Sequence, residues 1–113
     1  EKCKNKNWLG VLLACVTPEI IENSVDEIKK LNIPFGYKAN LWKVEEPVPV
    51  HQFASPSDKI GANPIESMGT RDDYSGKMFL EFSKKMINKG ATILGGCCEI
   101  KPSHIKKISS LKE

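Results

Sequence analysis

The fold is indicated first by residues 8–31, which read WLGVLLACVTPEIIENSVDEIKKL. Residues 8–14 are apolar without alternation, as in a strand that is buried on both faces of a parallel sheet. Thr17 and Pro18 then have the residue types of a helix N-cap and a first helical position. The apolar residues that follow are spaced by four, three and three, at Ile21, Val25, Ile28 and Leu31. The stretch therefore predicts a buried strand followed by an amphipathic helix.

The same order of strand and helix recurs further along the chain. Residues 35–40 predict a short second strand, and residues 91–94 predict a third. Between them, residues 74–88 predict a helix that Gly90 ends. A last helix is predicted to begin at Pro102. We expect these two helices to bury Met78, Phe79, Phe82 and Met86, and Ile105, Ile108 and Leu111, respectively.

Three strand–helix units in succession predict an α/β protein in which helices cover a sheet of parallel strands. Two architectures agree with this order. One is a small doubly wound sheet, and the other is a portion of a (β/α)₈ barrel, which needs about 250 residues when complete. Three units are too few to close a barrel, so a length of 113 residues by itself favours the open sheet.

A long segment without periodicity, residues 41–73, separates the second strand from the second helix. It is rich in Pro, Ser, Asn, Asp and Gly, which predicts a loop. Loops longer than about 12 to 15 residues are uncommon inside compact domains and often have a function. The segment is therefore either a lid over a site or an insertion on the surface.

Composition and charge limit the classes of protein to which the chain can belong. Its 113 residues, 40% of them hydrophobic, are typical of one globular domain. The longest apolar run, residues 11–16, has six residues, whereas a membrane-spanning helix needs about 20. The net charge is only +3, and the lysines stand in scattered pairs rather than in one basic stripe. We expect a soluble, cytoplasmic protein that binds neither membranes nor nucleic acid.

The four cysteines are the residues most suited to chemistry. Long periodic segments and an adjacent Cys pair argue against a secreted disulfide scaffold. Cys15 follows the first predicted strand, and Cys97 and Cys98 follow the third. All three are thus predicted at the carboxyl edge of the sheet, where α/β proteins build their sites. Cys3 lies in a polar leader, and we expect it to have no function.

The adjacent pair can reach one point only if the chain turns there, because successive side chains of a strand point to opposite faces. Gly95 and Gly96 would permit that turn. Three thiolates around one Zn²⁺ leave a fourth tetrahedral position open, as in catalytic sites. A thiol bound there would be deprotonated and nucleophilic, which suits alkyl transfer to sulfur.

Other interpretations of these residues remain open at this point. The cysteines can be small buried apolar side chains, or Cys97 and Cys98 can form a strained disulfide. His51 and His104 are each a candidate fourth ligand, although an isolated histidine is more often a surface or packing residue.

Residues 90–105, GATILGGCCEIKPSHI, resemble the C-terminal signature of the homocysteine S-methyltransferase family, in which Gly-Gly-Cys-Cys is followed by Pro-x-His-Ile. In that family the first zinc cysteine ends an earlier strand, like Cys15, and an Asn ends the next strand, like Asn40. The resemblance implies Cys15, Cys97 and Cys98 as zinc ligands and Asn40 as a substrate-binding residue. Ala14, where relatives usually have Asn, and Lys38 depart from the family pattern.

The resemblance also changes the expected architecture. The family fold is a (β/α)₈ barrel, so residues 1–113 would be its C-terminal part, with strands six to eight and residues 41–73 as a long loop. Residue 1 is not Met, and we expect the chain to be a fragment of a longer reading frame that lacks the first five units here. The acidic residues with which the family holds the homocysteine amino group would then be missing.

The activity that the resemblance implies is zinc-dependent transfer of a methyl group to the thiol of homocysteine, giving methionine. The partners would be homocysteine and a small-molecule methyl donor, namely a sulfonium, a betaine-type ammonium or a methylated folate. Two alternatives remain. The chain is a non-catalytic metal-binding or redox module, or it is an inactive gene fragment whose open strand edges favour aggregation.

Overall fold

A computed structural model of the chain describes residues 7–43 and 69–112. The described elements are β1 (Val11–Ala14), α1 (Pro18–Lys29), β2 (Phe35–Ala39), α4 (Gly76–Asn88), β3 (Ile93–Gly96), α5 (Pro102–Ile108) and the 3₁₀ turn η1 (Ser109–Leu111). Their order confirms the three predicted strand–helix units. Cys3, His51 and most of the predicted loop lie outside the described residues.

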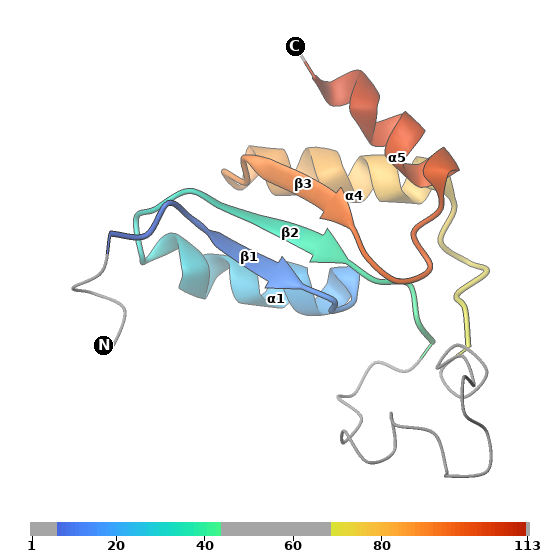
Figure 1. Cartoon of the computed structure of the whole chain (residues 1–113), viewed down its shortest axis with the longest axis horizontal. Helices are drawn as coiled ribbons and strands as arrows, with labels where there is room; N and C mark the ends of the chain where they lie inside the picture. Colours follow the sequence, from blue (N-terminus) through green and yellow to red (C-terminus); the bar gives the residue numbers. More distant parts are fainter. Residues whose placement is uncertain (1–6, 44–68, 113) are drawn as a thin grey trace, which may run out of the picture.

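The three strands form one parallel sheet in the order β1-β2-β3. Leu12 of β1 is opposite Gly36 of β2, and Gly36 is in turn opposite Ile93 of β3. Figure 1 shows the strands side by side with their arrowheads at the same edge. The predicted α/β class with parallel strands is therefore confirmed, and the carboxyl ends of all three strands meet at one edge.

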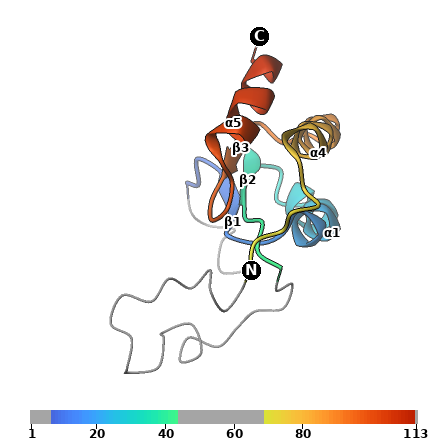
Figure 2. The same ribbon diagram turned by 90° about the vertical axis from the view of Figure 1, so that its right-hand side faces the viewer.

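One face of the sheet is covered by α1 and α4, which lie on the same side of it in Figure 2. The core between these layers includes Ile21 and Val25 of α1, Tyr37 of β2, and Phe79 and Met86 of α4, all fully buried. Removal of this apolar surface from water supplies the main driving force for the fold.

A chain of hydrogen bonds crosses this core. The Tyr37 hydroxyl donates to Ser83 Oγ over 2.6 Å, and Ser83 Oγ donates to the Phe79 carbonyl over 2.8 Å. Burial raises the pKa of Tyr37 to about 12, although the Ser83 hydrogen bond opposes the shift. The two hydroxyls are thus satisfied inside the apolar layer, as buried polar groups must be.

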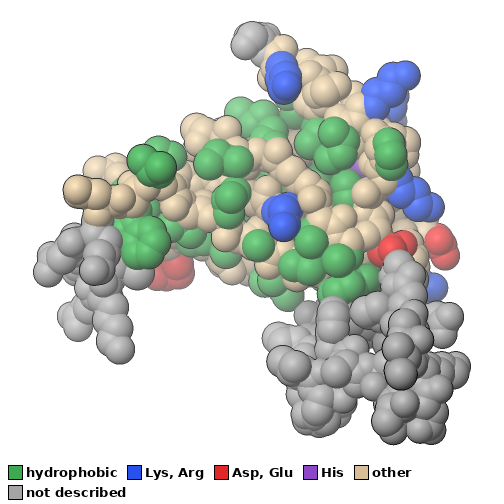
Figure 3. All heavy atoms as spheres, in the orientation of Figure 1, with side chains coloured by type: hydrophobic (Ala, Val, Ile, Leu, Met, Phe, Trp, Pro, Cys, Tyr) green, Lys and Arg blue, Asp and Glu red, His purple; other side chains and the backbone are tan. Residues whose placement is uncertain are grey.

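The opposite face of the sheet is open within the described part of the chain. Leu12 is 50% exposed and Ile93 is 41% exposed, and Lys38 projects from the same face between them and the carboxyl edge. Figure 3, in which the sheet lies in front of α1 and α4, shows apolar side chains spread over this surface. The prediction that the first strand is buried on both faces is wrong for these residues, because the helices cover only one face.

The first strand is also shorter than predicted. Its hydrogen bonds to the neighbouring segment begin where the Val11 N–H donates to the Pro34 carbonyl, over 2.9 Å. Trp8 and Leu9, which precede that bond, are outside the strand and exposed. The apolar run of residues 8–14 thus contains a strand of four residues.

Three helix positions that were predicted to be buried are exposed, namely Leu31, Met78 and Ile105. Leu31 lies beyond the end of α1 at Lys29. The buried stripe of α4 passes through Phe79, Ser83 and Met86, and that of α5 through His104 and Ile108, at spacings of three and four residues. Met78 and Ile105 are each one residue to the side of a buried stripe that includes a polar residue, Ser83 or His104.

The two described ends of the long loop meet each other. Trp42 and Thr70 form an antiparallel bridge, with the Lys43 N–H donating to the Gly69 carbonyl and the Arg71 N–H to the Leu41 carbonyl. The bridge lies just beyond the carboxyl end of β2. None of the helices in the described ranges is long and apolar enough to cross a bilayer.

Candidate metal centre

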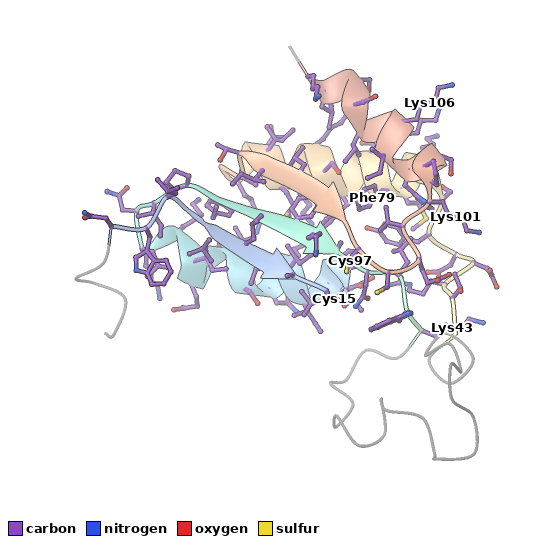
Figure 4. The ribbon with its side chains drawn as sticks, viewed as in Figure 1. Cys15, Lys43, Phe79, Cys97, Lys101 and Lys106 are labelled. Atoms are coloured by element: carbon purple, nitrogen blue, oxygen red, sulfur yellow. The ribbon has the colours of Figure 1, made fainter. Side chains whose placement is uncertain are left out.

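Two strand ends bring three cysteines together. Cys15 directly follows β1, and its N–H donates to the Lys38 carbonyl over 2.8 Å. Cys97 directly follows β3, and its N–H donates to the Ala39 carbonyl over 2.7 Å. Both cysteines are therefore fixed to β2 from opposite sides, and Figure 4 shows Cys15 and Cys97 close together beyond the strands. The predicted meeting of the cysteines at this edge is confirmed.

The chain turns at Cys97–Cys98, after the two glycines rather than at them. Gly95 and Gly96 are the last residues of β3, and neither has a positive φ. The Ile100 N–H donates to the Cys97 carbonyl over 3.2 Å and closes a four-residue turn. The prediction that the glycines form the turn is wrong. Gly96 is required because any Cβ there would collide with the Ile100 side chain, which folds back over the strand.

One member of the cluster and one neighbour of it have left-handed backbone conformations, namely Cys15 with φ 58° and Glu99 with φ 63°. Such a conformation costs a residue other than glycine roughly 1–2 kcal/mol. Unfavourable backbone geometry of this kind is found most often at functional sites, where the surrounding structure holds it in place. Here it turns the chain sharply after β1 and after β3.

The three sulfur atoms have the spacing of ligands around one metal ion. Cys98 Sγ lies 3.8 Å from Cys15 Sγ and 3.8 Å from Cys97 Sγ, and all three atoms lie within 4.8 Å of one another. Two sulfurs bound to one tetrahedral zinc at ~2.3 Å are separated by ~3.8 Å. The cluster is therefore consistent with a zinc site.

The three clustered cysteines, Cys15, Cys97 and Cys98, are free thiols and partly buried. The separation of Cys97 Sγ from Cys98 Sγ, 3.8 Å, is far beyond the ~2.05 Å of a disulfide bond, so the adjacent pair is not oxidised. Soft thiolate donors select zinc and similar metals over magnesium or calcium. The described residues thus offer a donor set with a definite metal preference.

The pKa values of the Cys97 and Cys98 thiols are shifted in opposite directions. Burial opposes ionisation of Cys97, but hydrogen bonds from Cys15 and from the Cys98 N–H outweigh it and lower the pKa of Cys97. Burial, together with hydrogen bonds to Cys97 and Cys15, raises the pKa of Cys98 to about 12. A cation bound by all three sulfurs must displace the protons of the thiols.

Asn40 is placed to hold Cys15. Its side chain is 4% exposed, and its Nδ2 donates to the Cys15 carbonyl over 2.7 Å and lies 3.9 Å from Cys15 Sγ. Its Oδ1 accepts a 3.4 Å hydrogen bond from the Trp42 N–H. The predicted contact of Asn40 with a substrate stays a prediction. What the structure adds is that the amide fixes the turn that carries the first thiol.

His104 has a different role from the one considered for it. Its Nδ1 accepts a 2.9 Å hydrogen bond from the Lys101 N–H, and its Nε2 lies 3.0 Å from the Tyr74 carbonyl, to which it donates. Both ring nitrogens are thus occupied, and His104 is not part of the cysteine cluster. The suggestion that His104 is a fourth ligand is wrong. The residue instead ties α5 to the segment before α4.

Sequence reasoning missed two residues next to the cluster. Thr70 Oγ1 donates to Glu99 Oε2 over 2.6 Å, and Glu99 directly follows Cys98. Thr70 lies in a segment without periodicity, so no local pattern indicated it. The only signal in the sequence was an acidic side chain directly after the Cys pair.

Three clustered thiols at the carboxyl edge of a parallel sheet are consistent with a metal site in an α/β protein. The model of the family described as Homocysteine S-methyltransferase matches residues 1–111. The chain belongs to this family, which confirms the resemblance seen in residues 90–105. No curated protein and no solved structure matches the chain.

Proposed function

We propose that this chain carries the metal centre of an enzyme that transfers a methyl group to the thiol of homocysteine and so makes methionine. The observation that carries the proposal is the 3.8 Å spacing of Cys98 Sγ from both Cys15 Sγ and Cys97 Sγ. Family membership supports the identity of the reaction. The three cysteines would be the ligands of one Zn²⁺.

The proposed reaction joins the homocysteine sulfur to a methyl carbon. The new S–CH₃ bond forms as the bond between that carbon and the donor's sulfur or nitrogen breaks, and the electron pair of the broken bond stays on the donor. The thiol proton passes to solvent. The donor is a small molecule with a methyl group on a sulfonium, a betaine-type ammonium or a folate nitrogen. When bound, zinc with three thiolate ligands supplies a fourth position at which a thiol loses its proton.

The residues of the chain prepare this site before any substrate arrives. Backbone hydrogen bonds from Cys15 and Cys97 to β2 fix two of the sulfur donors, and the turn after β3 places Cys98 beside them. Asn40 holds the Cys15 carbonyl, and from this position it would also border the bound homocysteine. Because reduced thiols persist in a reducing compartment, we place the protein in the cytoplasm.

We further propose that residues 1–113 are strands six to eight, with their helices, of a (β/α)₈ barrel. Two features support this placement: α1 and α4 lie on one face of the sheet, and the other face carries exposed apolar side chains such as Leu12 and Ile93. In a barrel, that second face would be the packed interior. Methyl transfer is therefore proposed for a protein in which the remaining units are present.

Zinc content and methyl transfer test the proposal together. The protein that contains this chain is purified, its zinc per chain is measured, and homocysteine is offered with each of the three donor classes. We expect one zinc per chain and methionine from one donor class. Cys97→Ala should lose both. Cys3→Ala, in the polar leader, is the matched control and should keep both.

Two results would reject parts of the proposal. Unchanged zinc content in Cys97→Ala would remove the metal centre. Stoichiometric zinc that depends on all three cysteines, with no methionine from any donor class, would favour the alternative of a non-catalytic metal-binding module.

A further inference from the structure

The turn that carries Cys98 is not held by its own backbone alone. Glu99 is the third residue of the turn closed by Ile100 and Cys97, and its φ of 63° is one that turns normally give to Gly or Asn. A glutamate at this position is costly unless its side chain has a compensating contact. We therefore expect the Glu99 carboxylate to make such a contact.

The Glu99 carboxylate is bound by Thr70. The 2.6 Å separation of Thr70 Oγ1 from Glu99 Oε2 is in the range of a strong hydrogen bond from a hydroxyl to a charged oxygen. The two residues are 29 positions apart, so this bond links the segment before α4 to the turn after β3.

Thr70 is itself fixed. The antiparallel bridge to Trp42 holds its backbone, and the next residue, Arg71, binds both carboxylate oxygens of Glu19 at 2.8 Å. Arg71 also pairs with Asp73 at 2.9 Å and lies over the Tyr74 ring. The hydroxyl that binds Glu99 is therefore anchored both to the segment after β2 and to α1.

The same bridge holds Cys98 directly. The Leu41 N–H donates to the Cys98 carbonyl over 3.1 Å, while the Leu41 carbonyl accepts from the Arg71 N–H over 2.8 Å. Within the turn, Leu41 thus holds the backbone of Cys98, and Thr70 holds the side chain of Glu99. Cys98 Sγ is the sulfur that lies 3.8 Å from each of the other two, so its direction decides whether the three can share an ion.

We propose that Thr70 and Glu99 are positioning residues of the metal centre, whose hydrogen bond keeps Cys98 Sγ directed at Cys15 and Cys97. This inference rests on the proposed metal centre and adds to it a part of the chain remote in sequence from all three cysteines. Outer groups that orient metal ligands typically change metal affinity 10- to 100-fold when they are removed.

Cobalt(II) is the probe for this role, because its absorption spectrum reports the number and geometry of thiolate ligands. Affinity is measured by competition with a chelator, and metal-free samples are checked for folding by circular dichroism. Thr70→Val removes the donor at nearly constant volume, and we expect it to weaken cobalt binding about 10- to 100-fold and to change the spectrum. Thr70→Ser, which keeps the hydroxyl, is the matched control and should stay within about threefold of the unchanged protein.

Variants of Glu99 keep the test decisive if Thr70→Val does not fold. Glu99→Gly relieves the backbone cost but removes the anchor, so it should fold and bind cobalt as weakly as Thr70→Val. Glu99→Gln retains an oxygen acceptor and should keep most of the affinity. Adding Thr70→Val to Glu99→Gly should have no further effect, because the two changes remove the same interaction.

The contradicting result is cobalt binding by Thr70→Val or Glu99→Gly with unchanged affinity and spectrum. Cys97→Ala separates this failure from a failure of the metal centre. If Cys97→Ala loses cobalt while Thr70→Val does not, only the positioning role is rejected. If Cys97→Ala also binds normally, the metal centre itself is rejected.

Discussion

The helix-covered face of the sheet and its carboxyl edge are built on different principles. On the covered face, the buried hydroxyls of Tyr37 and Ser83 are hydrogen bonded within an apolar layer, and no positive φ occurs in the strands or helices there. At the edge, Cys15 and Glu99 have unfavourable backbone conformations beside three clustered thiols. The covered face therefore stabilises the fold, whereas the carboxyl edge uses part of that stability to hold a site.

The largest expected effect lies in the core. Phe79 is fully buried, and Phe79→Ala should lower the free energy of unfolding by about 3–5 kcal/mol through lost burial and a residual cavity. Urea unfolding of the metal-free protein measures it. Met78, its 45% exposed neighbour on α4, is the control, and Met78→Ala should change stability by no more than about 0.5 kcal/mol. A larger loss of stability in Met78→Ala would show that the buried and exposed faces of α4 are assigned wrongly.

Alkaline pH should weaken the same core through Tyr37. The native pKa of about 12 exceeds the value near 10 of the unfolded chain, so the unfolded state loses its proton first. Stability should therefore fall between about pH 10 and 12, by about 1.4 kcal/mol per pH unit from this residue. Unfolding at several pH values measures it, and the difference from Tyr37→Phe isolates the contribution. Parallel curves for the two proteins would show that Tyr37 is not buried as described.

A change at the carboxyl edge should affect metal more than stability. Asn40→Ala removes the donor to the Cys15 carbonyl, and we expect metal affinity to fall about 10- to 100-fold. Asn88, exposed at the end of α4, supplies the control, since Asn88→Ala should leave affinity unchanged. Competition with a chelator measures both variants. Equal affinities in the two would argue that Asn40 does not position Cys15.

The smallest effect should come from the solvated surface, which belongs to neither region. Lys84 and Glu81 form an exposed ion pair one turn apart on α4, at 3.1 Å. Lys84→Ala should change the free energy of unfolding by no more than about 0.5 kcal/mol and should leave metal affinity unaltered. A clear loss in either measurement would mean that the boundary drawn between surface and core is misplaced.

Local pattern was enough to predict the strands, the helices and the edge at which the cysteines gather. Each of these depends on residues a few positions apart, such as Ile21 and Val25, or on where a strand ends, as for Cys15. The family signature in residues 90–105 likewise lies in one short stretch, and the family model agrees with it.

What the sequence did not indicate depends on contacts between distant residues. Ser83 is buried on α4 although it is polar, because its hydroxyl accepts a hydrogen bond from Tyr37, 46 residues away. Gly95 and Gly96 continue the strand, and the turn begins at Cys97 and places the Ile100 side chain over Gly96. Thr70 is held near Glu99 by its bridge to Trp42, and no periodicity in the sequence predicts that bridge.

The central claim is that Cys15, Cys97 and Cys98 bind one zinc ion together, and X-ray absorption at the zinc edge tests it most directly. The account predicts three sulfur neighbours at ~2.3 Å and one lighter atom, with two sulfurs remaining in Cys15→Ser. Two or fewer sulfur neighbours in the unchanged protein, or a spectrum indifferent to Cys15→Ser, would contradict it.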